Sequence, residues 1–408
     1  MRDKLLHTPE GVRDVYNEEC AGKLALQSRI LGVIRSYGYR DIETPTFEFF
    51  DVFSREVGTV PSKDLFKFFD REGNTLVLRP DITPSIARAA AKYFTEEDMP
   101  IRLCYEGNTF INNSSYQGRL KESTQLGAEL IGDSSVEADA EMVAMVVESL
   151  LKAGLQDFQV SIGQVDFFRS LLEEAGIDEE MEEVLKQLIS NKNTFGVEEL
   201  LEQMQIDNSL RELFVSLPQM FGSVEILDKA ASMTSNEKAI AALERLRKLY
   251  QILKEYGFTS YISFDLGMLS NYMYYTGIIF RAYTFGTGDA IVKGGRYDHL
   301  MGHFGKPAPS IGFVVVQNQL QNALRRQKIT ITTAQDSLML LYENPVRREA
   351  IMEACNLRRE GMRVELLCRN PEKSTEGYLE LAARKGISMV YEYRKQEGMV
   401  LLTKEKGR

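Results

Sequence analysis

The sequence contains few of the residues that bind metals or form disulfides. It has only three histidines and four cysteines in 408 residues. The cysteines lie far apart and form no CxxC pair, at Cys20, Cys104, Cys355 and Cys368. This spacing is typical of reduced, structural thiols in a cytoplasmic protein. His299 and His303 are four residues apart but lack the carboxylate of an HExxH motif, so we expect a solvated pair and no metal site.

Long apolar runs and an excess of basic residues are also absent. No run approaches the roughly 20 residues that span a bilayer, and the charged segment 1–7 has no apolar stretch behind it. We therefore expect neither a membrane span nor a signal peptide. There are 59 acidic and 49 basic residues, for a net charge of −10. Because phosphate binding needs a dense basic surface, this balance argues against a large nucleic-acid interface.

The length and the patterning are those of a multidomain globular protein. Apolar periodicity predicts helices at 18–37, 83–94, 136–153, 346–360 and 374–385. Short apolar or alternating runs predict strands at 75–78, 101–105, 158–162, 261–266, 275–283, 310–316, 337–342, 363–367, 387–391 and 399–402. The segment 165–257 is helix-rich and acidic, and the polar segment 327–335 reads as a linker. The alternating β and α elements after it predict a small mixed or parallel sheet.

The segment 123–130 alternates between two faces. Gln125, Gly127 and Glu129 share one face, where the glycine leaves room for a group to lie against the backbone. The other face is largely apolar and should pack on a core, with Thr124, Leu126, Ala128 and Leu130. Asp81 and Thr83 form a second polar pair. Periodicity alone favours an antiparallel sheet with one solvated face. The alternative is a site for a ligand that carries an ammonium or a ring N–H.

Several motifs in order along the chain resemble class II aminoacyl-tRNA synthetases, and among them histidyl-tRNA synthetases. The matching stretches are Thr8–Asp14, Tyr39–Pro45 with Phe47–Phe53 (the dimer-forming first motif), Leu78–Thr83, Gln125–Glu129 and Gly294–Asp298. The resemblance implies an α+β fold with an antiparallel sheet flanked by helices, a helical insertion and a small C-terminal α/β domain. It divides the chain into a first core part, an insertion, a second core part and a reduced anticodon-binding-like domain, at 1–164, 165–257, 258–326 and 327–408.

Three departures from that family remove its phosphate-binding arginines. Ile111 stands in place of the arginine in Phe-Arg-x-Glu. Ser270 begins the stretch Ser-Asn-Tyr-Met-Tyr-Tyr, where the family has Arg-Gly-Leu-Asp-Tyr-Tyr, and Gln319 replaces the arginine of Gly-Leu-Glu-Arg. Arginines of this kind neutralise charge on the transferred group, so each loss should cost several kcal/mol of transition-state stabilisation. The pattern argues against aminoacylation and leaves no catalytic residue to assign.

The amino-acid side of the family's site is retained. The resemblance implies that Asp81, Thr83 and Gln125 hold an α-ammonium, and that Glu129 and Tyr275 hold the imidazole nitrogens. Tyr274 and Tyr297 belong to the same implied histidine site. Structural roles are the alternative for single residues: the tyrosines as strand aromatics, and Arg79 as a packing or ion-pair residue.

This combination is similar to the regulatory subunits of short-form ATP phosphoribosyltransferase. That family is a non-ligase paralogue of histidyl-tRNA synthetase and associates with the catalytic subunit that condenses ATP with phosphoribosyl pyrophosphate, the first step of histidine biosynthesis. The resemblance implies a hetero-oligomer inhibited by histidine, self-association as a dimer, no cofactor and no tRNA partner. Two alternatives remain open: a divergent histidyl-tRNA synthetase that uses Arg281 or Lys293, and another non-ligase paralogue.

Overall fold

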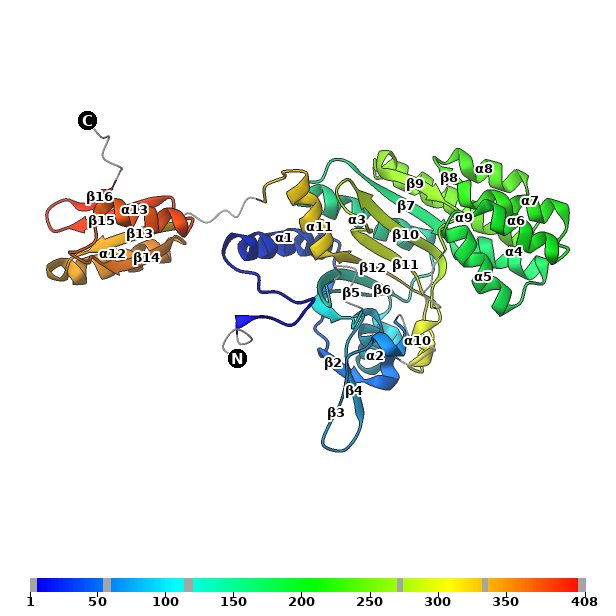
Figure 1. Ribbon diagram of the computed structural model, residues 1–408, viewed down its shortest axis with the longest axis horizontal. Helices are drawn as coiled ribbons and strands as arrows, with labels where there is room; N and C mark the ends of the chain where they lie inside the picture. Colours follow the sequence, from blue (N-terminus) through cyan, green and yellow to red (C-terminus); the bar gives the residue numbers. More distant parts are fainter. Residues whose placement is uncertain (1–5, 54–59, 114–119, 270–273, 332–336, 403–408) are drawn as a thin grey trace. The chain divides into compact units, whose positions relative to one another are not determined.

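The structure is a computed structural model that describes residues 6–53, 60–113, 120–269, 274–331 and 337–402 (Figure 1). Contacts divide the chain into two units, Met1–Asp14 with Leu26–Ile331, and Val15–Ala25 with Thr332–Arg408. The predicted stretch Ser270–Met273 and part of the predicted linker lie outside the described residues. Within the described part of the chain, no helix is long and apolar enough to cross a membrane.

A nine-stranded sheet organises the first unit, in the order β1-β5-β6-β12-β11-β10-β7-β9-β8. In that order the strands are Arg40–Asp41, Ile101–Phe110, Glu122–Ile131, Ser310–Val316, Val292–Arg296, Thr276–Thr284, Phe158–Gln164, Ile262–Asp265 and Phe221–Gly222. The central strands from β5 to β7 pair antiparallel, whereas β1 joins β5 and β9 joins β7 in parallel. The predicted α+β class with a sheet flanked by helices is therefore confirmed.

One face of this sheet carries the main core. Leu126, Ala128 and Leu130 of β6 are buried there, so the predicted apolar face of this strand is confirmed. The helices that cover this face include α1 (Asn17–Ser36) from Leu26 onward, α3 (Val136–Ala153) and α11 (Gln317–Arg326). The bounds of α3 are those predicted, because Ser135 caps the first turn by accepting from the Ala138 N–H at 3.1 Å and Gly154 ends the helix with φ +104°.

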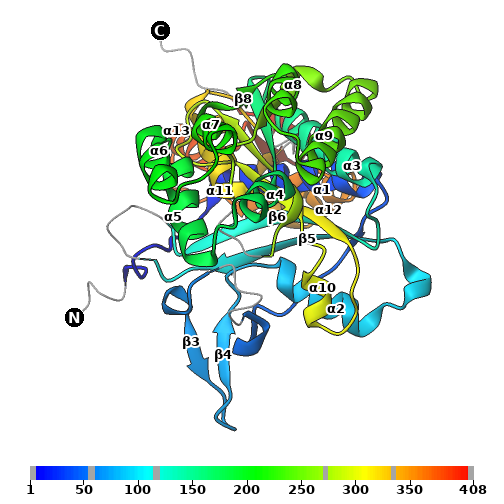
Figure 2. The ribbon, with the colours of Figure 1, turned by 90° about the vertical axis from the view of Figure 1, so that its right-hand side faces the viewer.

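The opposite face of β5 and β6 carries α2 (Thr83–Tyr93), α10 (Leu300–His303) and a small sheet of order β2-β4-β3 (Figures 1 and 2). The strands of the small sheet are β2 (Phe47–Phe49), β3 (Lys67–Phe69) and β4 (Thr75–Leu78). Arg79 follows β4 and is buried, with its guanidinium donating to the Thr44 and Asn108 carbonyl oxygens at 2.8 and 2.9 Å. Arg79 thus ties the small sheet to β5, which supports the structural interpretation of this residue.

Strand β5 is longer than the sequence predicts. The predicted strand ends at Tyr105, whereas β5 continues to Phe110 and pairs with β6 along its whole length, from Ile101 opposite Ile131 to Phe110 opposite Glu122. Polar residues such as Asn108 break the apolar pattern, but cross-strand pairing maintains the extended backbone. A strand held by its neighbour does not need local periodicity.

The chain between β7 and β9 is mainly helical and also contains the short strand β8. Its helices are α4 to α9, at Val165–Ala175, Glu179–Ser190, Thr194–Gln203, Asn208–Ser216, Glu225–Ser232 and Glu237–Glu255. Four of them begin at Asp or Asn side chains that accept a backbone N–H of the first turn: Asp178, Asn193, Asp207 and Asn236. Short 3₁₀ segments lie at Phe50–Phe53, Ser62–Asp64, Glu96–Asp98, Leu217–Gln219, Thr259–Tyr261 and Asn344–Val346.

The second unit contains a four-stranded sheet of order β14-β13-β15-β16. Its elements are β13 (Ser337–Tyr342), α12 (Arg347–Arg359), β14 (Arg363–Cys368), α13 (Thr375–Arg384), β15 (Met389–Arg394) and β16 (Gly398–Leu401). Strand β13 pairs in parallel with β14 and β15, and β16 closes the edge antiparallel. This is the small mixed sheet that the alternating pattern predicts.

Candidate functional site

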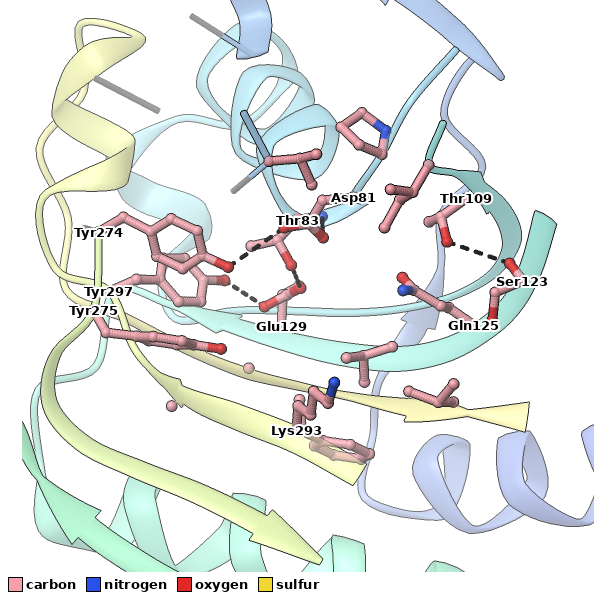
Figure 3. A pocket seen from close by; sticks show the side chains of 18 residues that line it. Asp81, Thr83, Thr109, Ser123, Gln125, Glu129, Tyr274, Tyr275, Lys293 and Tyr297 are labelled. Atoms are coloured by element: carbon pink, nitrogen blue, oxygen red, sulfur yellow. Dashed lines mark hydrogen bonds between the residues drawn. The ribbon is translucent and has the colours of Figure 1, made fainter. Parts of the chain in front are cut away.

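A cavity of about 180 Å³ opens on the face of the large sheet that lies opposite the main core. Strands β6, β11 and β12 form its floor, and the segment before α2 reaches over it (Figure 3). The structure brings all seven residues of the implied histidine site to this cavity: Asp81, Thr83, Gln125, Glu129, Tyr274, Tyr275 and Tyr297. They come from segments that are far apart in the sequence, so the fold rather than local pattern assembles the group.

Glu129 is the central acid of the cavity and is only 1% exposed. Its Oε1 accepts a hydrogen bond from the Thr83 hydroxyl at 2.7 Å, and its Oε2 accepts one from the Tyr297 hydroxyl. Burial raises the pKa of Glu129 from its ordinary 4.5 to about 8, although these two donors oppose the shift. The cavity therefore holds a carboxyl group that is easily protonated and that a bound cation would ionise.

Asp81 places a second carboxylate beside Glu129. Its Oδ1 accepts the backbone N–H of Thr83 at 3.2 Å, and its Oδ2 accepts the Tyr274 hydroxyl at 3.4 Å. The charge of Asp81 contributes to the raised pKa of Glu129. The charge of Asp81, next to a Glu129 carboxyl that a bound cation would ionise, favours a ligand with an ammonium or a protonated ring.

Gln125 extends from β6 into the cavity, closer to its other end (Figure 3). Its Oε1 is buried and has no hydrogen-bond partner among the described residues. A buried acceptor without a donor costs about 1–3 kcal/mol. A ligand N–H in the cavity would remove that cost, so this amide points to an occupant.

Two glycines in the neighbouring strands make room for the site. Gly312 lies opposite Glu129 in the register of β12 and β6, and a Cβ on Gly312 would stand 1.7 Å from Glu129 Oε2. A Cβ on Gly295 would stand 2.8 Å from Tyr275 Cε1. Sequence reasoning missed Gly312, although a glycine inside the apolar strand 310–316 is the signal of a close approach.

Gly127 has a different role from the one the alternation suggests. The room beside its backbone is occupied by the ring of Tyr105 from β5, because a Cβ at Gly127 would lie 2.5 Å from Tyr105 Cζ. The glycine of Gln-Leu-Gly-Ala-Glu therefore accommodates a protein side chain. The ligand-facing positions of β6 are its neighbours on the same face, Gln125 and Glu129.

The Gln125 end of the cavity is largely apolar. Ile111 and Val60 line it together with Val316, the cross-strand partner of Gln125. Ile111 is the position where the resembling family has an arginine. Thr109 and Ser123 also line this end, joined by a hydrogen bond of 3.3 Å from the Thr109 hydroxyl to the Ser123 carbonyl. Among the described lining residues, none at this end carries a charge.

Of the other two lost arginine positions, one falls in the part of the chain that the structure describes. Gln319 lies in the first turn of α11 and is not among the described lining residues. Ser270 lies outside the described residues. Of the two basic residues considered as substitutes, Lys293 lines the cavity, and Arg281 is absent from its described lining.

Arg296, next to Tyr297, is a structural residue. Its buried guanidinium donates to Asp139 Oδ1 at 2.6 and 3.0 Å, and Arg245 of α9 donates to Asp139 Oδ2 at 2.7 Å. This arrangement fixes the end of β11 and with it the ring of Tyr297. In the residues that the structure describes, no group of three or more His, Cys, Asp or Glu side chains is arranged to hold a metal ion.

Comparisons with known proteins identify the family of this chain. The sequence model of the histidyl-tRNA synthetase family matches residues 11–320. The ATP phosphoribosyltransferase regulatory subunit of Acetivibrio thermocellus is 40% identical over 407 residues, covering 100% of this chain and 97% of the relative. That of Ruminiclostridium cellulolyticum is 42% identical over 360 residues, covering 88% and 86%.

Solved structures show the same relationship. The crystal structure of an ATP phosphoribosyltransferase regulatory subunit/histidyl-tRNA synthetase from Bacillus halodurans is 31% identical with a TM-score of 0.85, covering 95% of this chain and 98% of that one. Histidyl-tRNA synthetase from Nostoc shares the fold, with a TM-score of 0.79 at 20% identity, covering 95% and 91%. The chain belongs to the family of ATP phosphoribosyltransferase regulatory subunits, built on the histidyl-tRNA synthetase fold.

Proposed function

We propose that this regulatory subunit senses histidine and transmits its presence to a short-form ATP phosphoribosyltransferase catalytic subunit. One observation carries the proposal. The cavity keeps the acidic and amide groups that suit an amino acid, and it has apolar side chains such as Ile111 where an ATP-binding enzyme needs arginine. A cavity of this kind binds the amino acid and does not activate it.

The arrangement of polar groups suits the two ends of histidine. Burial raises the pKa of Glu129, so this carboxyl group is easily protonated. A protonated imidazole ring with an N–H directed at Glu129 would ionise the carboxyl and form a charge-assisted hydrogen bond with it. The α-ammonium would lie between Asp81 and Gln125, where it gives the Gln125 Oε1 a donor. Tyr275 lines the same cavity and offers a hydroxyl that donates or accepts for the second ring nitrogen.

Feedback requires that histidine bind differently to the inhibited and active forms of the complex. Such couplings are typically about 1–3 kcal/mol, or 5- to 150-fold in affinity. Linkage makes the effect reciprocal, so the catalytic subunit must change the affinity of this chain for histidine by the same factor. A cytoplasmic location and the absence of a tRNA partner are part of the proposal.

Titration calorimetry of the full chain with L-histidine tests the sensing function. We expect binding to the chain alone or to its complex with the short-form catalytic subunit, and inhibition of that complex by histidine. Glu129→Gln should weaken binding at least tenfold, because a neutral amide replaces the acceptor of the ring N–H. Glu122→Gln, on the same strand but outside the described lining, is the matched control. No histidine binding in either preparation would refute the proposal.

We also propose self-association through the small sheet. Phe47, Phe49 and Phe68 lie on one face with Leu76 and Leu78, as the cross-strand pairs show. The three phenylalanine residues are 52%, 55% and 37% exposed, which is a large apolar area for a solvated surface. Sedimentation should show a dimer that Phe47→Asp disrupts. Phe195→Asp, an exposed ring in the helical segment, should leave the dimer intact.

A further inference from the structure

Lys293 is the only basic side chain among the described residues that line the cavity. It lies on β11 on the same face as Gly295 and Tyr297, and its side chain rises from that strand toward the cavity (Figure 3). The described acids of the lining are Asp81 and Glu129. An occupant with a negative group therefore finds one full positive charge here.

The sheet register places Lys293 between the two ligand-facing positions of β6. Lys293 pairs with Val314 of β12, and Val314 pairs with Gly127. Gly127 lies midway between Gln125 and Glu129. Two strand spacings, about 10 Å, separate β11 from β6, with β12 between them. The four-carbon stem of a lysine and a small ligand lying over β12 are long enough to span this distance.

The ion pair that Lys293 makes is too exposed to hold its ammonium in place. Its Nζ lies 3.1 Å from Asp289 Oδ2, with the two side chains 32% and 56% exposed. Exposed pairs of this kind contribute little to stability. The ammonium can therefore turn from Asp289 toward an anion in the cavity with little loss.

We propose that Lys293 binds the α-carboxylate of the ligand and makes the cavity selective for zwitterionic amino acids over amines. This inference rests on the proposed function and deepens it. The two acids would repel a carboxylate, and the apolar Ile111 end offers it no charge. A lysine binds a carboxylate as a mobile point charge, without the two-pronged geometry that arginine supplies to phosphates.

Calorimetry with a pair of ligands tests the assignment. L-histidine and histamine share the imidazole and the ammonium, and only histidine has the carboxylate. On the full chain, with and without the catalytic subunit, Lys293→Met should weaken histidine binding roughly 10- to 100-fold and leave histamine binding unchanged. Lys293→Arg should restore most of the preference for histidine. Asp289→Ala removes the ion pair and keeps the ammonium, so it should leave histidine binding intact.

The outcomes separate this inference from the proposed function. If the unmodified chain binds histidine and Lys293→Met weakens both ligands equally or neither, the carboxylate assignment is wrong and the sensing function stands. If Asp289→Ala reproduces the loss, Lys293 acts through its ion pair and the assignment is also wrong. If the unmodified chain and its complex bind neither ligand, both proposals fall.

Discussion

The two ends of the cavity differ in chemistry. At the end marked by Glu129, a buried carboxyl receives hydrogen bonds from Thr83 and Tyr297 beside a second acid, Asp81. At the end marked by Gln125, Ile111 and its neighbours present mainly methyl groups. Four residues of one strand, roughly 13 Å, separate the two ends. A site for amino-acid activation needs charge at both ends, and here the described lining of the Gln125 end carries none.

The largest effect should come from filling the gap opposite Glu129. Gly312→Ala puts a methyl group where the carboxylate of Glu129 lies. Overpacking of this kind costs about 1–3 kcal/mol, and displacement of the acid should lower histidine affinity roughly 100-fold. Calorimetry and urea unfolding measure the two losses. Gly302→Ala, where an added Cβ meets nothing within 4 Å, should change neither.

The pH dependence of stability should be the next largest effect. The pKa of Glu129 is raised in the folded chain, from 4.5 to about 8, so the folded state holds a proton that the unfolded state releases across this range. The contribution of Glu129 is therefore fully present below about pH 4.5 and is lost as the pH rises through 8. Each pKa unit corresponds to about 1.4 kcal/mol.

Urea unfolding of the ligand-free chain between pH 5 and 8 tests this sign. The free energy of unfolding should fall more steeply with pH in the unmodified chain than in Glu129→Gln, whose side chain does not titrate. If the free energy of unfolding falls equally steeply with pH in both proteins, Glu129 is ionised in the ligand-free chain throughout this range. Binding of a cation would then not change the charge of Glu129.

A smaller effect is expected from Tyr297→Phe. It removes a donor that lowers the pKa of Glu129, so that pKa should rise further. Loss of a hydrogen bond to a charged group costs about 1.5–3 kcal/mol, and histidine affinity should fall about tenfold. Tyr37→Phe loses a comparable bond to Glu148 away from the cavity and should affect stability without affecting affinity.

The smallest effect should come from returning one arginine to the apolar end. Ile111→Arg should leave histidine affinity within about twofold, because the acids Asp81 and Glu129 lie at the other end of the cavity and position 111 is partly exposed. Histidine-dependent pyrophosphate exchange should stay undetectable, since one cation does not replace three. Pyrophosphate exchange by the unmodified chain or by this variant would show that the Gln125 end of the cavity still binds ATP for amino-acid activation.

Sequence pattern predicts those features that neighbouring residues determine. The inward face of β6 and both ends of α3 follow from alternation and from the caps at Ser135 and Gly154. The seven cavity residues were identified by resemblance to a family, because no local pattern links Asp81 to Tyr297. Their binding of histidine stays a prediction.

Contacts between distant segments could not be predicted from periodicity. The closeness of Gly312 to Glu129, the ring of Tyr105 over Gly127 and the extension of β5 all depend on which strands become neighbours. The role of Arg79 depends on carbonyl groups from two other segments. The sequence gives the chemical type of each side chain, but the register of the sheet determines which residues each side chain contacts.

The fit between Gly312 and Glu129 limits how this protein can change over evolutionary time. A side chain at position 312 would meet Glu129 Oε2 and also the Ala128 carbonyl oxygen, 1.7 and 2.8 Å from its Cβ, so loss of the acid would remove only part of the clash. Changes in ligand preference are therefore open to position 129, whereas the backbone of the neighbouring strand keeps position 312 a glycine.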